Sequence, residues 1–224
     1  MKVYGSIASP FVQRVLMAAR IKGHDLPVEP PLGGSMQSPE FRAISPMGRI
    51  PVLEDDGWTL AESAAIVGYL DEVLDGPPLL PGTLRERAHA RTIETLASHE
   101  LAGLRPIMVC KVFGMRDEPV LVTEAIATIR AGLEALEKAR DSNHVWAAGD
   151  QPGVADCILV PLFSLMEIID PAAGTLALIA EQPGLAAYRD RAFASEIGGR
   201  TVREMKEAFA AILERRRQPA PQSS

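Results

Sequence analysis

Cysteine is scarce in this chain of 224 residues, and the pattern of what is missing excludes several chemistries. The two cysteines, Cys110 and Cys157, are far apart and form neither a Cys-x-x-Cys pair nor the spacing of zinc ligands. The histidines show no metal-ligand pairing either, so we expect no bound metal. Each is expected to be a surface or capping residue: His24, His89, His99 and His144.

Long apolar runs are missing too. No segment approaches the roughly 20 apolar residues of a membrane-spanning helix, and residues 1–5 lack the apolar stretch of a signal peptide. The net charge of −6 gives no electrostatic reason to expect nucleic acid or an anionic membrane as a partner. We therefore predict a cytoplasmic protein with neither partner. The basic run at 215–217 is interpreted as charge that favours a helix C-terminus, rather than as a binding patch.

The composition is that of a globular protein, since 47% hydrophobic residues allow a sizeable core. Ser9 and Pro10 are typical of the N-cap and first position of a helix, and Gly23 is typical of its end. Prolines at 27, 30 and 31 confine the second strand to a sheet edge, because they cannot donate ladder hydrogen bonds. The expected order is β-α-β-α-β-β-α: a strand at 2–5, a helix to Gly23, a strand at 25–32, a helical turn at 39–44, a hairpin at 49–60 and a helix at 63–74.

The pattern changes at a Pro- and Gly-rich linker, residues 77–84, beyond which strand patterns disappear. Amphipathic stretches follow at 84–113 (kinked by Pro106), 119–139, 154–169, 183–193 and 201–217. We therefore predict an α/β domain over residues 1–76, an all-helical domain over residues 85–217 and a disordered Pro- and Ser-rich tail over residues 218–224.

Ser9 is the most informative position, because residues 9–12 stand where thiol redox proteins of this topology place a Cys-x-x-Cys pair. Dithiol exchange is excluded there, but a serine at a helix N-terminus can stabilise the thiolate of a ligand. Lowering a thiol pKa by about two units needs roughly 2.7 kcal/mol. A helix terminus supplies about 0.3–2 kcal/mol and a hydrogen bond to a charged acceptor roughly 1.5–3 kcal/mol, so both together suffice. The alternative is that Ser9 only caps the helix.

Four separated stretches carry a family resemblance: residues 4–15 (YGSIASPFVQRV), 45–53 (SPMGRIPVL), 60–66 (LAESAAI) and 154–156 (VAD). In order and spacing they resemble the serine-type soluble glutathione transferases of bacteria, and the similarity covers nearly the whole chain. The resemblance implies a thioredoxin-like α/β N-terminal domain followed by an all-α helical bundle domain. It also implies glutathione as co-substrate, a small electrophile as second substrate, and a homodimer.

The resemblance gives roles to residues beyond Ser9. It implies a cis peptide at Ile50-Pro51 whose exposed backbone pairs with the cysteine of glutathione; the alternative is a sheet-edge proline. It also implies that Glu62 and Ser63, at a helix start, bind the ammonium and carboxylate of the γ-glutamyl group. The alternative there is a plain serine cap beside a first-turn acid.

The chain departs from the family pattern at two places. Arg49 occupies a position near the glycyl end of glutathione where the family often has lysine or glutamine. Gln37 stands where related sequences often carry His or Lys, and it brings no charge, so the contact to the glycyl carboxylate stays open. Gly153 replaces the usual Ser or Thr that forms a reciprocal cap with Asp156, a departure that bears on folding rather than catalysis.

The electrophile is expected between the domains, against Phe11, Met108 and Phe113, although such residues are more often core. The sequence thus predicts an enzyme that conjugates the glutathione thiolate to a small hydrophobic electrophile. Peroxidase or isomerase activity stays open; isomerisation is disfavoured because the Ser-Ser-Cys signature of the maleylacetoacetate isomerase branch is missing from residues 6–12. A non-enzymatic ligand-binding or protein-interaction module is the other alternative, which the intact Ser9 and Glu62-Ser63 disfavour.

Overall fold

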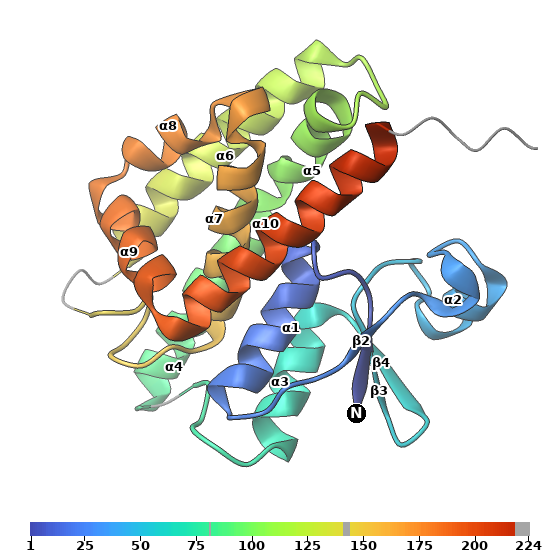
Figure 1. Ribbon diagram of the computed structural model, residues 1–224. Coiled ribbons are helices and arrows are strands. Elements are labelled where there is room, and N and C mark those ends of the chain that lie inside the picture. The colour runs from blue at the N-terminus through green and yellow to red at the C-terminus, as the bar shows by residue number, and fades with distance from the viewer. Residues whose placement is uncertain (81, 141–143, 218–224) are drawn as a thin grey trace, which may run out of the picture.

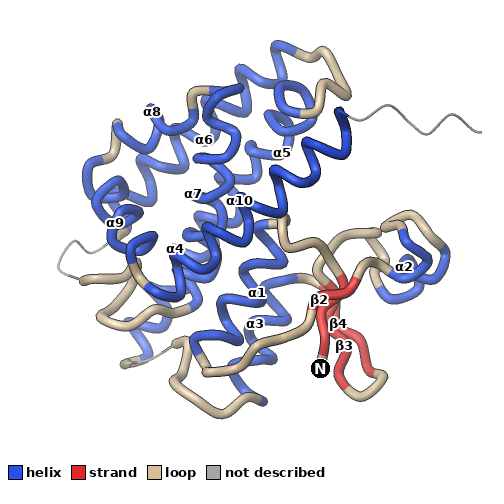
Figure 2. Tube along the Cα trace, viewed as in Figure 1, coloured by secondary structure: helices blue, strands red, loops and turns tan. Residues whose placement is uncertain are grey.

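The computed structural model describes residues 1–80, 82–140 and 144–217. Residue 81 of the predicted linker and the predicted tail at 218–224 lie outside these ranges. Figure 1 shows a small sheet with α1 and α3 beside it, and a larger group of helices that packs against α1. Figure 2 shows that the strands are confined to the first part of the chain and that the rest is helical. The predicted combination of a thioredoxin-like α/β domain and an all-helical domain is confirmed.

The sheet has the order β2-β1-β3-β4, with β2 at an edge as predicted. Strand β1 (Lys2–Tyr4) pairs parallel with β2 (Val28–Glu29) and antiparallel with β3 (Val52–Asp55), which forms a hairpin with β4 (Trp58–Ala61). The second strand is far shorter than the predicted 25–32. Its prolines explain the difference, since Pro27 contributes only a carbonyl, which accepts a 2.9 Å hydrogen bond from the Val3 amide.

Two helices flank the sheet on the side of the helical domain, and one short helix lies apart from them (Figure 1). Helix α1 (Pro10–Ile21) packs against α3 (Ser63–Val73) and against helices of the second domain, so nearly all of its faces are buried. Helix α2 (Pro39–Ile44) precedes the β3–β4 hairpin. The hairpin turn, Asp56-Gly57, has φ of 46° and 83°, which is the two-residue turn whose twist suits adjacent strands.

The second domain is built from α4 to α10 around the buried helix α7. The bounds are α4 Leu84–Glu100, α5 Leu104–Ile107, α6 Pro119–Ala139, α7 Val154–Ala173, α8 Thr175–Ala180, α9 Pro183–Ala194 and α10 Glu196–Arg217. The sequence analysis missed α8 and began α10 at residue 201, five residues late.

The stretch at 84–113 was predicted as one helix kinked by Pro106, but in the structure the helix breaks ahead of that residue. A 3₁₀ turn at Leu101–Gly103 separates α4 from α5, and a π-helical segment, Met108–Val112, follows. A proline ring clashes with the carbonyl four residues earlier, which here belongs to Ala102. The break therefore falls inside the turn rather than at the proline itself.

Asp156 anchors the start of α7 in the core. Its carboxylate accepts hydrogen bonds from the Gly153 and Ala147 amides, each at 2.9 Å, and from the Tyr188 hydroxyl at 2.7 Å. Gly153 has an extended backbone that any residue could adopt, but a Cβ there would lie 2.5 Å from the Leu79 carbonyl oxygen. A side chain at position 153 therefore has no room beside this carbonyl.

We therefore expect Gly153→Ser to destabilise the protein, although it restores the hydroxyl that the family usually carries. The loss in unfolding free energy should be about 1–3 kcal/mol, the cost of forcing atoms into a filled space. Urea unfolding followed by circular dichroism measures it. Gly149→Ser is the matched control, because the nearest atom to a Cβ there is 4.0 Å away. Equal stability of the two variants would contradict this account of Gly153.

Candidate active site

The register of β1, β3 and β4 brings three separate loops of the first domain together at one edge of the sheet. This edge is formed by the ends of the strands, not by an outer strand such as β2. Tyr4 at the end of β1 pairs with Val52, and Val52 pairs with Ala61 at the end of β4. The loop to Ser9 follows Tyr4, Ile50-Pro51 precedes Val52, and Glu62 follows Ala61. Neighbouring strands lie about 4.8 Å apart, so these three chain segments leave the sheet within roughly 10 Å of one another.

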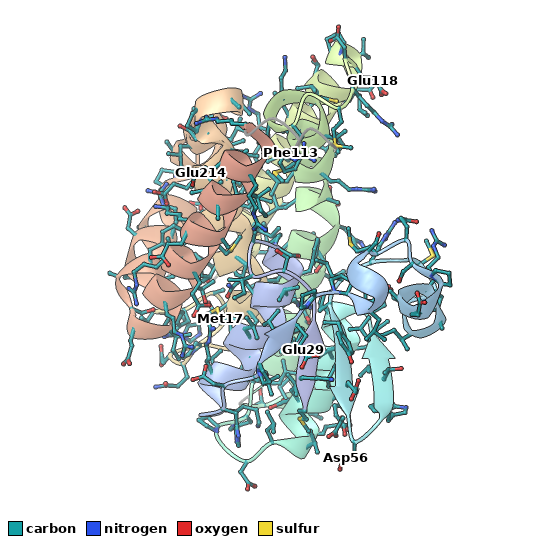
Figure 3. All side chains as sticks on the ribbon, turned by 45° about the vertical axis from the view of Figure 1, so that its right-hand side comes forward. Met17, Glu29, Asp56, Phe113, Glu118 and Glu214 are labelled. Atoms are coloured by element: carbon teal, nitrogen blue, oxygen red, sulfur yellow. The ribbon has the colours of Figure 1, made fainter. Side chains whose placement is uncertain are left out.

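This edge faces the second domain. Figure 3 labels Asp56 at the tip of the β3–β4 hairpin, at the end of the sheet away from the helical domain. The row of Tyr4, Val52 and Ala61 is at the opposite end of the hairpin register. The loops that carry the predicted glutathione residues therefore project toward the helices.

Ser9 occupies the N-cap position of α1 but does not cap the helix. It is half-buried with extended backbone, its amide donates to the Ser6 carbonyl at 2.9 Å, and its hydroxyl makes no hydrogen bond to helix α1. Among the described residues the hydroxyl has no hydrogen-bond partner at all. The hydroxyl and the free amides of the first helical turn are thus available to an anionic ligand.

The Ile50-Pro51 peptide is cis, as predicted. Gly5 lets this loop approach the start of α1, because a Cβ on Gly5 would lie 2.5 Å from Val12 and 3.6 Å from Ile50. Ile50 is half-buried, and its segment is held by Ser45, whose hydroxyl donates to the Arg49 carbonyl and accepts from the Arg49 amide. The cis peptide and the Ser9 loop therefore lie side by side.

Glu62 and Ser63 form the third part of the edge. Glu62 is exposed and has a φ of 72°, a conformation that costs a non-glycine residue of order 1–3 kcal/mol and is common at ligand sites. Ser63 is buried, and its Oγ accepts a hydrogen bond from Nη1 of Arg14 at 3.3 Å. Because Ser63 accepts this bond, its own proton remains available for a ligand carboxylate.

Arg14 links this site to the helical domain, and sequence analysis did not single it out. Its side chain is 2% exposed, donates through Nη2 to Glu94 of α4, and has a buried Nε without a partner. The guanidinium thus places a positive charge behind Ser63 while Glu94 balances it. In the sequence, the one signal for this role is the position of Arg14, about one and a half helical turns after Ser9.

At the predicted glycyl end, the structure adds a cation that the sequence analysis missed. Gln37 is exposed, and its amide oxygen accepts a 2.8 Å hydrogen bond from Arg42 of α2. The Arg42 guanidinium also lies beside Gly48, directly before Arg49. Arg49 is exposed, and its side chain has no partner among the described residues. Arg42 and Arg49 therefore both lie at the predicted site of the glycyl carboxylate, where, of these two arginines, the sequence analysis had expected Arg49 alone.

A cavity of about 530 Å³ lies in the helical domain, between the π-helical segment, α7 and α10. Of the three residues predicted to contact the electrophile, Phe113 lines it, whereas Phe11 and Met108 do not. Phe11 is exposed beside Ser9, and Met108 is half-buried against the core. Figure 3 shows Phe113 among the helices, beside the α10 ribbon.

Two family models match this chain: the glutathione S-transferase N-terminal domain over residues 3–78 and the C-terminal domain over residues 119–191. The maleylacetoacetate isomerase of Rattus norvegicus is 33% identical over 164 residues, which are 71% of this chain and 74% of the relative. The chain belongs to the glutathione S-transferase family.

Further comparisons agree with this assignment. Glutathione S-transferase Z1 of Arabidopsis thaliana is 33% identical over 168 residues, 72% of this chain and 75% of the relative. Glutathione transferase F7 from Populus trichocarpa superposes with a TM-score of 0.77 at 26% identity, over 91% of this chain and 98% of the other. Maleylacetoacetate isomerase from Methylobacterium extorquens AM1, solved with malonate and GSH, gives 0.72 at 27% identity, over 92% and 97%. The protein is thus a glutathione S-transferase-family enzyme.

The described part of the protein contains no group of three or more His, Cys, Asp or Glu residues arranged to hold a metal ion. Within the same ranges, no helix is both long and apolar enough to cross a membrane. Cys157 is fully buried, and burial raises the pKa of its thiol well above the ordinary value, so this thiol is a packed core group.

For the buried Arg14–Glu94 pair, we predict that replacing the acid lowers the unfolding free energy more than replacing the base. Glu94→Gln leaves the buried Arg14 charge unbalanced and should cost about 3–5 kcal/mol of unfolding free energy. Arg14→Met should cost less, because Glu94 is 16% exposed and can recruit water. Urea unfolding gives both values. The control is Glu181→Gln, which breaks the exposed Arg130–Glu181 pair and should cost about 1 kcal/mol or less. A Glu94 effect as small as the control would contradict the buried role of Arg14.

Proposed function

We propose that the chain binds glutathione along the sheet edge and that Ser9 stabilises its thiolate for attack on an electrophile held by the helical domain. The observation that carries this proposal is the Ser9 hydroxyl, which sits at the N-terminus of α1 without capping it. A serine that served only as a cap would accept a hydrogen bond from the first turn. Its free hydroxyl favours a ligand role over the capping alternative.

The dimensions of the edge support a tripeptide ligand. The row from Tyr4 to Ala61 spans roughly 10 Å, and three extended residues reach about the same length. Glutathione would run from Glu62 and Ser63, which receive the γ-glutamyl ammonium and carboxylate, past the Ile50 backbone. Its glycyl carboxylate would then lie near Arg42, Arg49 and the free amide nitrogen of Gln37.

The electrostatics fit thiolate stabilisation. The cysteinyl sulfur would lie at Ser9, where one hydroxyl donor and the positive end of α1 both favour negative charge. Helix α1 carries no acidic residue in its first turn to oppose this field. The two effects together supply the roughly 2.7 kcal/mol that a shift of two pKa units requires.

A glutathione-dependent isomerase is the second candidate, favoured by relatives that bear the name maleylacetoacetate isomerase. Both reactions begin with addition of the thiolate to an electrophilic carbon; conjugation keeps the new C–S bond, whereas isomerisation breaks it after rotation. Residues 6–12 read SIASPFV and lack the Ser-Ser-Cys signature of that branch. We therefore place conjugation first, and a direct assay of cis–trans isomerisation separates the two.

The remaining proposals rest on the change of sequence pattern at the linker and on family membership. We propose domains at 1–76 and 85–217 joined by the linker at 77–84, a cytoplasmic location, and a homodimer in which the first domain of one subunit packs against the helical domain of the other. The non-enzymatic alternative is not retained, because the chain belongs to a family of enzymes and keeps Ser9, Glu62 and Ser63.

Ser9→Ala should lower kcat for conjugation of 1-chloro-2,4-dinitrobenzene roughly 10- to 100-fold, the value of one hydrogen bond to a charged acceptor. The KM for glutathione should change little, because the other contacts are intact. Steady-state kinetics at neutral pH, with glutathione and the electrophile varied in turn, measure both parameters.

Ser6→Ala is the matched control for this prediction. Ser6 lies in the same loop, is half-buried like Ser9, and its side chain has no hydrogen-bond partner among the described residues. Its removal should leave kcat within about twofold, since surface changes outside the site cost little. A larger loss in Ser6→Ala than in Ser9→Ala would transfer the proposed role to Ser6.

A further inference from the structure

The cavity in the helical domain has an apolar floor. The rings of Phe113 and Phe209 stack with centroids 6.0 Å apart, and Ile169 and Leu213 line the walls. All of its lining residues lie between positions 111 and 217, so the helical domain alone forms it. Its volume of about 530 Å³ falls in the range of small-molecule sites.

The rim of the cavity has the opposite charge to the protein as a whole. The chain carries a net charge of −6, yet the charged residues that line the cavity are all cations: Lys111, Arg216 and Arg217. No carboxylate among the described residues pairs with any of the three. A concave apolar surface with unbalanced positive charge at its rim attracts an anionic group on an apolar body.

Arg216 is held in place by uncharged partners. Its guanidinium carbon lies 4.3 Å from the centroid of the Phe113 ring, and Nη2 lies 4.0 Å from the Met115 sulfur. A ring face fixes the orientation of a guanidinium without neutralising its charge. The planar donors of Arg216 therefore remain available for a carboxylate at the cavity mouth.

The cavity and the loop that carries Ser9 both lie beside α10, at different positions along the helix. The Gln13 side chain donates to the Ile7 carbonyl in that loop and to Glu204 of α10, so loop and helix share one partner. Phe209 follows Glu204 by about 7.5 Å along the helix axis, and Arg216 by about 18 Å. An extended substrate can thus place its reactive carbon toward Ser9 and its far end at Arg216. Figure 1 shows α10 running past the start of α1.

We propose that this cavity selects electrophiles that carry a carboxylate on an apolar body, and that Arg216 is the residue that determines this specificity. The inference rests on the proposed function and narrows its substrate class from hydrophobic electrophiles to apolar carboxylic acids. It also gives different roles to the three residues of the basic run at 215–217. The sequence analysis had interpreted the whole run as charge that favours a helix C-terminus. Arg215 fits that assignment, because its Nε donates to the Ala211 carbonyl and it does not line the cavity.

The test compares two ligands with the same apolar body, 4-phenylbutanoate and 4-phenylbutanamide, by isothermal titration calorimetry on the full chain. We expect the carboxylate to bind about tenfold more tightly than the amide, as for a hydrogen-bonded charge near solvent. Arg216→Gln should remove this preference without weakening the amide. Arg215→Gln makes the same change of charge one residue away and should retain the preference.

Saturation with S-(2,4-dinitrophenyl)glutathione, the conjugate, should block 4-phenylbutanoate, whereas glutathione alone should not. Equal binding of the two ligands, equal loss in both arginine variants, or simultaneous binding of conjugate and 4-phenylbutanoate would each overturn the inference. Ser9→Ala should leave the carboxylate preference unchanged. A failure of Ser9 to affect turnover would therefore count against the proposed function, and a missing preference would count against this inference alone.

Discussion

The pairing of β1, β3 and β4 in one register is the constraint on which the site depends. Tyr4, Val52 and Ala61 stand side by side, and from each the chain leaves the sheet at the same edge, toward Ser9, Ile50 and Glu62. A slip of one residue would exchange Val3 and Leu53, which pack in the main core, with Tyr4 and Val52, which pack with Phe41 on the other face of the sheet. The core therefore fixes the register, and the register brings three polar motifs within the length of one tripeptide.

The helical domain holds this edge from behind. Arg14 of α1 reaches Ser63 on one side and Glu94 of α4 on the other, so the start of α3 and the domain junction share one buried cation. Asp156 fixes the start of α7, the helix against which α1 packs. In the proposed function, the second domain thus contributes to glutathione binding through the positions of α1 and α3, and its cavity receives the other substrate.

Sequence patterns predicted what local chemistry determines. The start of α1 at Pro10, the hairpin within 49–60 and the edge position of β2 all follow from residues within a few positions. The cis peptide before Pro51 was implied by the family resemblance, because the local residues left a sheet-edge proline open. Contacts between distant residues were beyond reach. The Leu79 carbonyl that requires Gly153, the pairing of Arg14 with Glu94 and the position of Arg42 beside Gly48 depend on tertiary packing. Likewise, the sequence analysis placed the interruption at Pro106. In the structure it lies in the turn that contains Ala102, whose carbonyl would clash with the proline ring.

The central claim is that Ser9 lowers the pKa of bound glutathione, and thiolate absorbance in the ultraviolet, followed against pH with the protein saturated, tests it most directly. The account predicts a bound-thiol pKa about two units below that of free glutathione, because both the hydroxyl and the helix terminus favour the thiolate. In Ser9→Ala the shift should fall to about 1.5 units or less, because the helix terminus alone supplies at most about 2 kcal/mol. An unshifted thiol in the wild-type protein, or a full shift that survives in Ser9→Ala, would contradict the account.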